Sequence, residues 1–383
     1  FWYPQMPTEG FFHATVHYEG PDSLTMIAEG APVPGTGGKT WETVVPVPGL
    51  GLAIGNFLPM VQEVDGRTVY AWQAPRLAGR AHAVAKRTAE ALAFYEQLLG
   101  PLSLERLDVV QLPFGLGGSV GQYSLLIYDD MNDEIPLDNE VMLAYMAAHE
   151  AAHKWIGFTA GLRLLGTTWI SEGLTDYLAF LAVEHMYGTE GMREVIYERA
   201  IKPLANHTGR IRSLPSIDVI DDDLEVAYQK GSLVFRALHR RLGDEAFFRF
   251  VRTFVQDYAQ DHATSNDFLS LLNRLGGTQV QRFVADWING TQQLDYTLTD
   301  VRTEPAGQGE RVSFRVASAG RLTEPGPVDV MIELADGRAE LVSVSLGERA
   351  SFTFDQPVAR ITVDPDYWLP DWHRANNVWT AAN

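Results

Sequence analysis

The pattern of apolar and polar positions changes twice along the chain and divides it into three parts. Residues 1–75 alternate short β-type runs, such as 15–18 and 43–47, with turns rich in proline and glycine, which indicates antiparallel sheet. From 76 the apolar positions recur with a helical period, and after Gly290 they return to a period of two. We therefore expect three domains, with boundaries near 75 and 290.

The middle part is predicted to be mostly helical and the last part to be a small β-sandwich. The expected helices are 81–99, 139–156, 169–186, 228–242, 244–258, 266–275 and 280–288, with strands at 107–112 and 124–128. The expected strands of the last part are 311–316, 328–334, 341–345, 351–354 and 360–363. The fold class is thus α+β and multidomain: part of an N-terminal antiparallel β-domain (1–75), a helix-rich domain (76–290) and a β-sandwich (291–383).

Composition narrows the classes of partner. The 383 residues carry a net charge of −19 without any Lys/Arg cluster, which excludes nucleic acid as an expected partner. No apolar run reaches the roughly 18 residues of a membrane span. The chain begins at Phe1 rather than at methionine, so a longer precursor and the localisation both stay open.

The absence of cysteine restricts the chemistry available for metal binding. With no cysteine in the sequence, a metal must be held by imidazole and carboxylate groups. His149 and His153 lie four residues apart in a strongly helical run and so share one helix face. Two imidazoles at this spacing suit a zinc ion, and Glu150, next to the first, is the expected general base.

A catalytic zinc site needs a third protein ligand and an open position. Glu172, 19 positions beyond His153 on a second helical segment, is the expected third ligand. Asp176, one turn later, is the expected hydrogen-bond acceptor for the free ring N–H of a ligating histidine, although an ordinary surface carboxylate is an equally good interpretation.

Other polar residues have simpler interpretations. One histidine on an apolar helix is usually a packing or surface group, and only the joint pattern points to metal. The remaining histidines show no ligand spacing; they are His13, His17, His82, His185, His207, His239, His262 and His373. The acidic run 221–223 is best interpreted as a solvated loop.

These motifs resemble those of the gluzincin aminopeptidases, the family typified by aminopeptidase N and leukotriene hydrolase, whose catalytic domain is thermolysin-like. The family's HExxH motif, the glutamate after 18 further residues and its Trp-x-x-Glu-Gly motif are matched by His149, Glu150, His153, Trp169, Glu172 and Gly173. The resemblance implies one zinc ion per chain, peptide substrates, and further domains beyond both ends.

A further family signature, Tyr-x-Lys-Gly, is matched by Tyr228, Lys230 and Gly231. By itself Tyr228 would be a half-buried packing residue. The resemblance implies instead that its hydroxyl donates a hydrogen bond to the oxyanion formed during peptide hydrolysis.

One segment departs from the family. Aligning the strand 124–128 with the strand after the family's Gly-Ala-Met-Glu-Asn motif puts Gly118, Ser119, Val120, Gly121 and Gln122 on that substrate-binding motif. Gly121 then stands where the family has its amine-binding glutamate.

We expect a zinc metallopeptidase in which Glu150 moves the proton and Tyr228 stabilises the oxyanion. Two alternatives stay open. The first is a peptidase of altered specificity, without strict recognition of the N-terminal amine. The second is a non-catalytic binding or scaffold module that keeps the fold.

Overall fold

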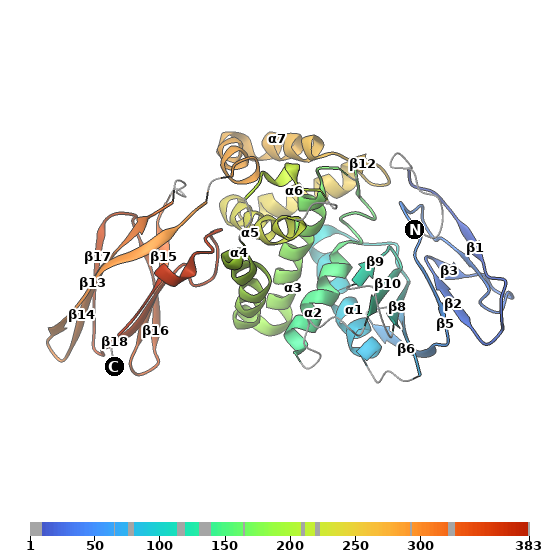
Figure 1. Ribbon diagram of the computed structural model, residues 1–383, viewed down its shortest axis with the longest axis horizontal. Helices are drawn as coiled ribbons and strands as arrows, with labels where there is room; N and C mark the ends of the chain where they lie inside the picture. Colours follow the sequence, from blue (N-terminus) through green and yellow to red (C-terminus); the bar gives the residue numbers. More distant parts are fainter. Residues whose placement is uncertain are drawn as a thin grey trace.

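A computed structural model describes most of the chain. The described residues are 10–64, 66–75, 80–112, 119–129, 139–163, 165–207, 211–218, 223–291, 293–320 and 326–381. Figure 1 shows three groups of elements side by side: N-terminal strands in blue, a helical centre, and C-terminal strands in orange and red. The fold is therefore mixed, with helices between separate sheets. The domain boundaries at 75 and 290 stay a prediction.

The first group consists of short antiparallel strands. Three form one sheet and two form a pair: β1 (Thr15–His17), β4 (Thr40–Glu42) and β3 (Ala31–Pro32), and β2 (Thr25–Ala28) with β5 (Leu52–Gly55). Residues 43–47, expected as a strand, contribute only an isolated bridge from Val47 to Phe12.

A five-stranded sheet lies between these strands and the helices. Its order is β6 (Leu58–Val64), β7 (Arg67–Gln73), β8 (Arg106–Leu112), β10 (Leu125–Asp129), β9 (Ser119–Gly121). β7, β8 and β10 are parallel, and the two edge strands are antiparallel to their neighbours. The strands at 58–73 thus pair with the central sheet rather than with the other N-terminal strands.

The central sheet is covered on both faces because its strands alternate two sets of apolar side chains. Val110, Leu125 and Ile127 pack in one core cluster with Ile27 and Trp41 of the N-terminal strands. Their neighbours Val109 and Leu126 belong to the core that extends through the helices. Helix α1 (Arg80–Leu99) is the crossover between the parallel strands β7 and β8.

Apart from one short helix at Lys202–Asn206, which was not predicted, the remaining helices follow the expected order, with different ends. They are α2 (Glu140–Ala152), α3 (Thr168–Ile196), α4 (Lys202–Asn206), α5 (Leu224–Leu242), α6 (Asp244–Asp257) and α7 (Ser265–Phe283), with π-helical turns at Tyr197–Ile201 and Val284–Ile288. The expected end of α3 near 186 corresponds to a kink at Gly188 (φ 73°), beyond which the helix resumes. Two short strands, β11 (Gly161–Leu162) and β12 (His262–Ala263), pair in parallel.

The C-terminal strands form two facing sheets. One is β13 (Tyr296–Ala306), β14 (Gly309–Ser318), β17 (Arg349–Phe354), and the other is β16 (Ala339–Val344), β15 (Val328–Leu334), β18 (Val358–Val363), β19 (Val378–Thr380). The sequence analysis missed β13 because, apart from Tyr296, its residues are at most partly buried and show no alternation of apolar positions.

The sandwich contacts the helices through the segment between β18 and β19. Arg236 of α5 is fully buried and donates to the carbonyl oxygens of Asp366 and Tyr367, and its guanidinium lies 3.9 Å from the ring centre of Trp368. Arg193 of α3 pairs with the Asp366 carboxylate. Within the described residues, no helix is long and apolar enough to cross a membrane.

Candidate active site

Two helices bring the predicted metal ligands together. α2 begins at Asn139, whose side chain accepts from the first free backbone N–H groups of the helix, and carries His149 and Glu150 in its last turn. His153 lies one residue past the end of α2 but keeps right-handed helical backbone angles. Its side chain therefore still lies one turn from that of His149 on the same helix face. The chain then reverses at Gly157, whose φ of 112° favours glycine. Glu172 lies in the first turns of α3.

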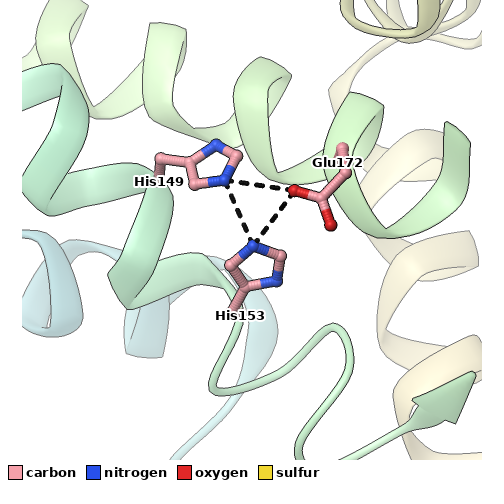
Figure 2. A group of neighbouring side chains, drawn as sticks. All are labelled: His149, His153 and Glu172. Carbon is pink, nitrogen blue, oxygen red and sulfur yellow. Dashed lines mark hydrogen bonds and ion pairs between the residues drawn. The ribbon is translucent and has the colours of Figure 1, made fainter. Parts of the chain in front are cut away.

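Three donor atoms of these residues face one another (Figure 2). The Nε2 atoms of His149 and His153 are 3.1 Å apart, and each lies 3.4 Å from Oε2 of Glu172. Ligands about 2.1 Å from a tetrahedral zinc ion are separated by roughly 3.4 Å. The donor set and its spacing therefore fit a zinc ion.

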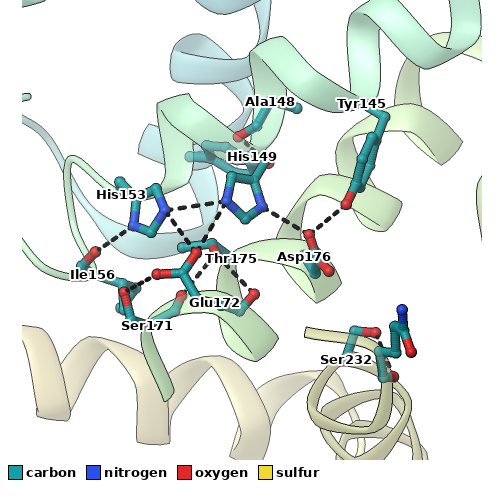
Figure 3. A network of polar contacts seen from close by, with 12 residues as sticks. Tyr145, Ala148, His149, His153, Ile156, Ser171, Glu172, Thr175, Asp176 and Ser232 are labelled. Carbon is teal, nitrogen blue, oxygen red and sulfur yellow. Dashed lines mark hydrogen bonds and ion pairs between the residues drawn. The ribbon is translucent and has the colours of Figure 1, made fainter. Parts of the chain in front are cut away.

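Hydrogen bonds on the far side of each ring orient the imidazoles, as Figure 3 shows. The Nδ1 atom of His149 lies 2.7 Å from Asp176, and that of His153 lies 3.1 Å from the backbone oxygen of Ile156. Both acceptors select the tautomer with a proton on Nδ1, which leaves Nε2 free as a ligand atom. Asp176 thus lies where the sequence analysis expected it.

Tyr145 is a residue of this network that the sequence analysis missed. It precedes His149 by one helical turn, is buried, and donates its hydroxyl to the same Asp176 oxygen at 2.5 Å. The Arg199 guanidinium lies 5.3 Å from the Tyr145 ring centre. The spacing of four residues between Tyr145 and His149 was the available signal, but a tyrosine at that spacing is usually a packing residue.

The electrostatics of the three donors reflect their proximity. Burial alone would raise the pKa of Glu172, but the charge of His153 and hydrogen bonds from both imidazoles hold it well below its usual value. Burial alone would lower the pKa of His149, but hydrogen bonds to Asp176 and Glu172 outweigh it and raise the pKa to about 10. The carboxylates of Asp176 and Glu172 thus favour positive charge beside them.

Glu150 and Tyr228 lie beside the donors. Glu150 is 6% exposed, and the ring of Tyr228 stacks on that of His149, with centroids 6.0 Å apart and planes 19° from parallel. Burial raises the pKa of Tyr228, and the charges of Glu172, Asp176 and Glu150 raise it further. The expected base and the expected oxyanion donor therefore share one site with the ligands.

Tyr228 is brought to the site by a close contact between α3 and α5. A Cβ atom on Gly173 would lie 2.8 Å from the Cα of Gly231, and one on Gly231 would lie 3.0 Å from the Cα of Gly173. Neither position accepts a larger residue without movement of a helix. Gly173 directly follows Glu172, and Gly231 follows Tyr228 by three residues. The contact between the glycines therefore fixes the distance between the Glu172 and Tyr228 side chains.

The predicted substrate-binding segment is an edge strand. Ser119, Val120 and Gly121 form β9, in which Gly121 is the antiparallel partner of Leu126 and which contacts α2; Gly118 lies outside the described residues. Among the strands described, β9 pairs only with β10, so its outer edge is unpaired.

Lys154, which was not predicted either, connects the hairpin formed by β9 and β10 to the turn that follows α2. It follows His153 directly, is fully buried, and donates to the backbone oxygens of Gln122 and, at 3.3 Å, Leu125. Burial lowers its pKa to about 8. The sequence offered no signal for it, because a lysine in a helix is usually solvated.

Comparison with known proteins agrees with this geometry. Residues 84–287 match the Peptidase family M1 domain. The chain is 26% identical to aminopeptidase M1 of Arabidopsis thaliana over 283 residues (68% of this chain, 30% of that protein) and 24% identical to glutamyl aminopeptidase of Sus scrofa over 211 residues (52% and 22%). It thus spans about a third or less of the length of these relatives.

The fold also matches a solved structure, a crystal structure of Legionella pneumophila aminopeptidase A in complex with aspartic acid. The TM-score is 0.64 at 18% identity, covering 91% of this chain and 42% of that one. The resemblance seen in the sequence motifs is confirmed, since the family match extends over more than half of the chain. The chain belongs to peptidase family M1.

Proposed function

We propose that this chain is a zinc-dependent metallopeptidase of the aminopeptidase type. In this proposal His149, His153 and Glu172 hold one zinc ion, Glu150 is the general base and Tyr228 stabilises the oxyanion. The single observation that carries the proposal is the triangle of His149 Nε2, His153 Nε2 and Glu172 Oε2, with sides of 3.1, 3.4 and 3.4 Å. When bound, zinc would act as a Lewis acid and activate water for attack on a peptide carbonyl.

Glu150 is the residue that moves the proton. Its carboxylate is adjacent in sequence to a ligand but absent from the donor triangle, so it is free to accept a proton from the attacking water and to deliver it to the leaving amine. Tyr228 contributes its hydroxyl as a hydrogen-bond donor to the oxygen of the tetrahedral intermediate. Asp176 and Tyr145 keep the His149 ring in place during these steps.

The peptide substrate would lie along the outer edge of β9, which no strand of the described residues occupies. An extended chain can add to an unpaired strand through main-chain hydrogen bonds, with Ser119, Val120, Gly121 and Gln122 forming the binding segment. Gly121 offers no carboxylate for a substrate amine. Glu172 is also a weak anchor for a substrate amine, because its Oε2 faces the histidines and its Oε1 accepts a hydrogen bond from Ser171 at 2.8 Å. This supports the variant of the proposal in which amine recognition is weak.

The first prediction tests the proton-transfer role. Glu150→Gln should keep zinc near one ion per chain by elemental analysis and lower kcat at least a thousandfold, because the amide cannot accept the proton. Glu245→Gln, an exposed change on α6, is the matched control and should retain full turnover. Loss of zinc in Glu150→Gln would contradict the assignment. A wild-type protein that binds zinc yet cleaves no peptide would favour the scaffold alternative.

The second prediction tests specificity at Gly121. Losing one charge-assisted contact costs roughly 1.5–3 kcal/mol, so N-blocked peptides should be cleaved within about two orders of magnitude of free ones in kcat/KM. Gly121→Glu should shift preference toward free amines. The control Gly10→Glu places the same charge at an exposed glycine far from β9 in sequence and should leave the preference unchanged. Strict refusal of blocked peptides by the unmodified chain would require another amine anchor.

A further inference from the structure

A buried glutamate outside the candidate active site holds the turn of the β9–β10 hairpin. Glu29 directly follows β2 of the N-terminal strands and is 1% exposed. Its Oε1 accepts from the backbone N–H of Ser124 at 2.9 Å and from the Ser124 hydroxyl at 2.6 Å. The same hydroxyl oxygen accepts from the backbone N–H of Gly30 at 2.7 Å. Ser124, in the hairpin turn, is thus bound to the N-terminal strands by both its backbone and its side chain.

The hairpin lies between the N-terminal strands and the helix that carries His149 (Figure 1). Lys154, in the turn that follows this helix, donates to the backbone oxygens of Gln122 and Leu125, which flank the residues of the hairpin turn. Burial raises the pKa of Glu29, and hydrogen bonds from Ser124 and the charge of Lys154 oppose this rise. The hairpin turn is therefore held by two buried groups of opposite charge, one from each neighbouring part of the fold.

The stability of the fold does not explain the carboxylate of Glu29. Its Oε2 is buried and has no hydrogen-bond partner among the described residues. Burying a carboxylate costs free energy even beside an ammonium, and an apolar side chain of similar volume often packs as well or better. A buried ionic group can instead fix one arrangement of the chain, because its partners must lie in particular places.

The hairpin turn determines the register of β9. The backbone N–H of Gln122 donates to the oxygen of Leu125 at 2.7 Å, and Gly121 then pairs with Leu126 and Val120 with Ile127. Backbone groups of a strand alternate between its two edges, so a slip by one residue would exchange those that face outward and turn every side chain to the other face. A fixed turn therefore decides which groups of β9 a bound peptide meets.

We propose that Glu29 is a positioning residue for peptide binding, which holds the β9–β10 turn so that the outer edge of β9 presents the correct backbone groups to the substrate. This inference rests on the proposed function. Glu29 acts through Ser124 and β9 rather than by contact with the peptide. Because Lys154 directly follows the proposed ligand His153, the strand held in this way is also placed relative to the proposed zinc site.

Two substrates that differ in length test the proposal: a four-residue peptide, which extends along β9, and an aminoacyl p-nitroanilide, which has one residue. Glu29→Ala should raise the KM of the peptide at least about tenfold, because the turn loses a charge-assisted hydrogen-bond acceptor. Its kcat, the KM of the p-nitroanilide and the zinc content should change less than about threefold. Glu29→Gln keeps an acceptor for Ser124 and should restore the KM of the peptide to within about threefold of the wild type.

Two further variants separate positioning from loss of stability. Met26→Ala removes a buried side chain of β2 that packs in the same N-terminal core; it should lower Tm and leave both KM values unchanged. Ser124→Ala removes the hydroxyl that joins Glu29 to Gly30 and should raise the KM of the peptide. Its effect should not add to that of Glu29→Ala, because the two residues form one connection. If Glu29→Ala does not fold, Ser124→Ala and Glu29→Gln decide the question.

Peptide binding without turnover provides an independent measurement. In a Glu150→Gln background, fluorescence polarisation of a labelled N-blocked four-residue peptide should show a Kd at least about tenfold higher when Glu29 is alanine. Equal changes for both substrates, an unchanged KM and Kd in Glu29→Ala, or the same rise in Met26→Ala would overturn the positioning role and leave the proposed function intact. A zinc-loaded wild type that cleaves neither substrate would overturn both.

Discussion

At the scale of single residues, the candidate site depends on hydrogen bonds that orient side chains already placed by the helices. Asp176 accepts from both Tyr145 and His149, the backbone oxygen of Ile156 faces His153, and Ser171 donates to Glu172. All three side chains of the proposed metal site are therefore held from outside the triangle. Partners of this kind typically contribute ten- to a hundredfold in metal affinity or activity. The reactive groups are thus fixed by neighbours that carry no chemistry themselves.

The third prediction concerns the hydroxyl of Tyr228. Tyr228→Phe removes one hydrogen-bond donor and keeps the ring that stacks on His149, so kcat should fall by roughly a hundredfold or more with little change in KM. Steady-state kinetics on one peptide substrate measure both constants. Tyr197→Phe, a change at a partly exposed tyrosine elsewhere in the chain, is the control. An effect confined to KM would move Tyr228 from oxyanion stabilisation to substrate binding.

At the scale of elements, the site depends on how closely α3 and α5 approach. The backbones of the two helices are in contact at Gly173 and Gly231. Only glycine at both positions permits this close approach. Glu172 and Tyr228 lie within three residues of that contact. The hairpin β9–β10 is also held in place, by Lys154 in the turn that follows α2.

The fourth prediction tests the contact between the helices. Gly231→Ala should lower the free energy of unfolding by about 1–3 kcal/mol through overpacking, although alanine is the better helix former. It should also lower kcat about tenfold or more by moving Tyr228 relative to Glu172. Gly10→Ala, where an added Cβ would meet nothing within 4 Å, is the control. If Gly231→Ala were as stable and as active as the wild type, the close approach would have no functional role.

At the scale of the whole molecule, the helical centre joins the two β-parts through different kinds of contact. The N-terminal strands share an apolar core with the central sheet. At the sandwich, the helices contribute a buried cation, Arg236 of α5, whose guanidinium donates to the backbone oxygens of Asp366 and Tyr367 and lies over the face of Trp368. A polar contact of this kind fixes orientation, because the donors must meet particular acceptors.

The fifth prediction tests that junction. Arg236→Met keeps much of the length of the side chain but leaves two partly buried carbonyl oxygens without their donor, which should lower the free energy of unfolding by about 2–4 kcal/mol. Differential scanning calorimetry should then show the sandwich unfolding before the helices, in a separate transition. Arg338→Met, at an exposed ion pair of the sandwich, is the control. One unchanged transition in Arg236→Met would show that other contacts hold the junction.

The sequence by itself determined the elements and the type of chemistry. Helical periodicity predicted α1 and α6 to within one residue at each end, and α2 and α5 to within four residues, because an amphipathic helix records its buried face in local spacing. The same spacing placed His149, in α2, and His153, one residue past its end, on one helix face. The absence of cysteine limited the candidate metal ligands to imidazoles and carboxylates, and Glu172 followed from its distance along the chain.

Tertiary structure decided the features that depend on residues far apart in sequence. The pairing of β7 with β8 depends on hydrogen bonds across 30 or more residues, and β13 carries no apolar alternation that reveals it. Lys154 received a role only when folding brought two backbone oxygens to its buried ammonium. Local spacing determines which face a residue takes, whereas desolvation and long-range contact determine what the residue can do there.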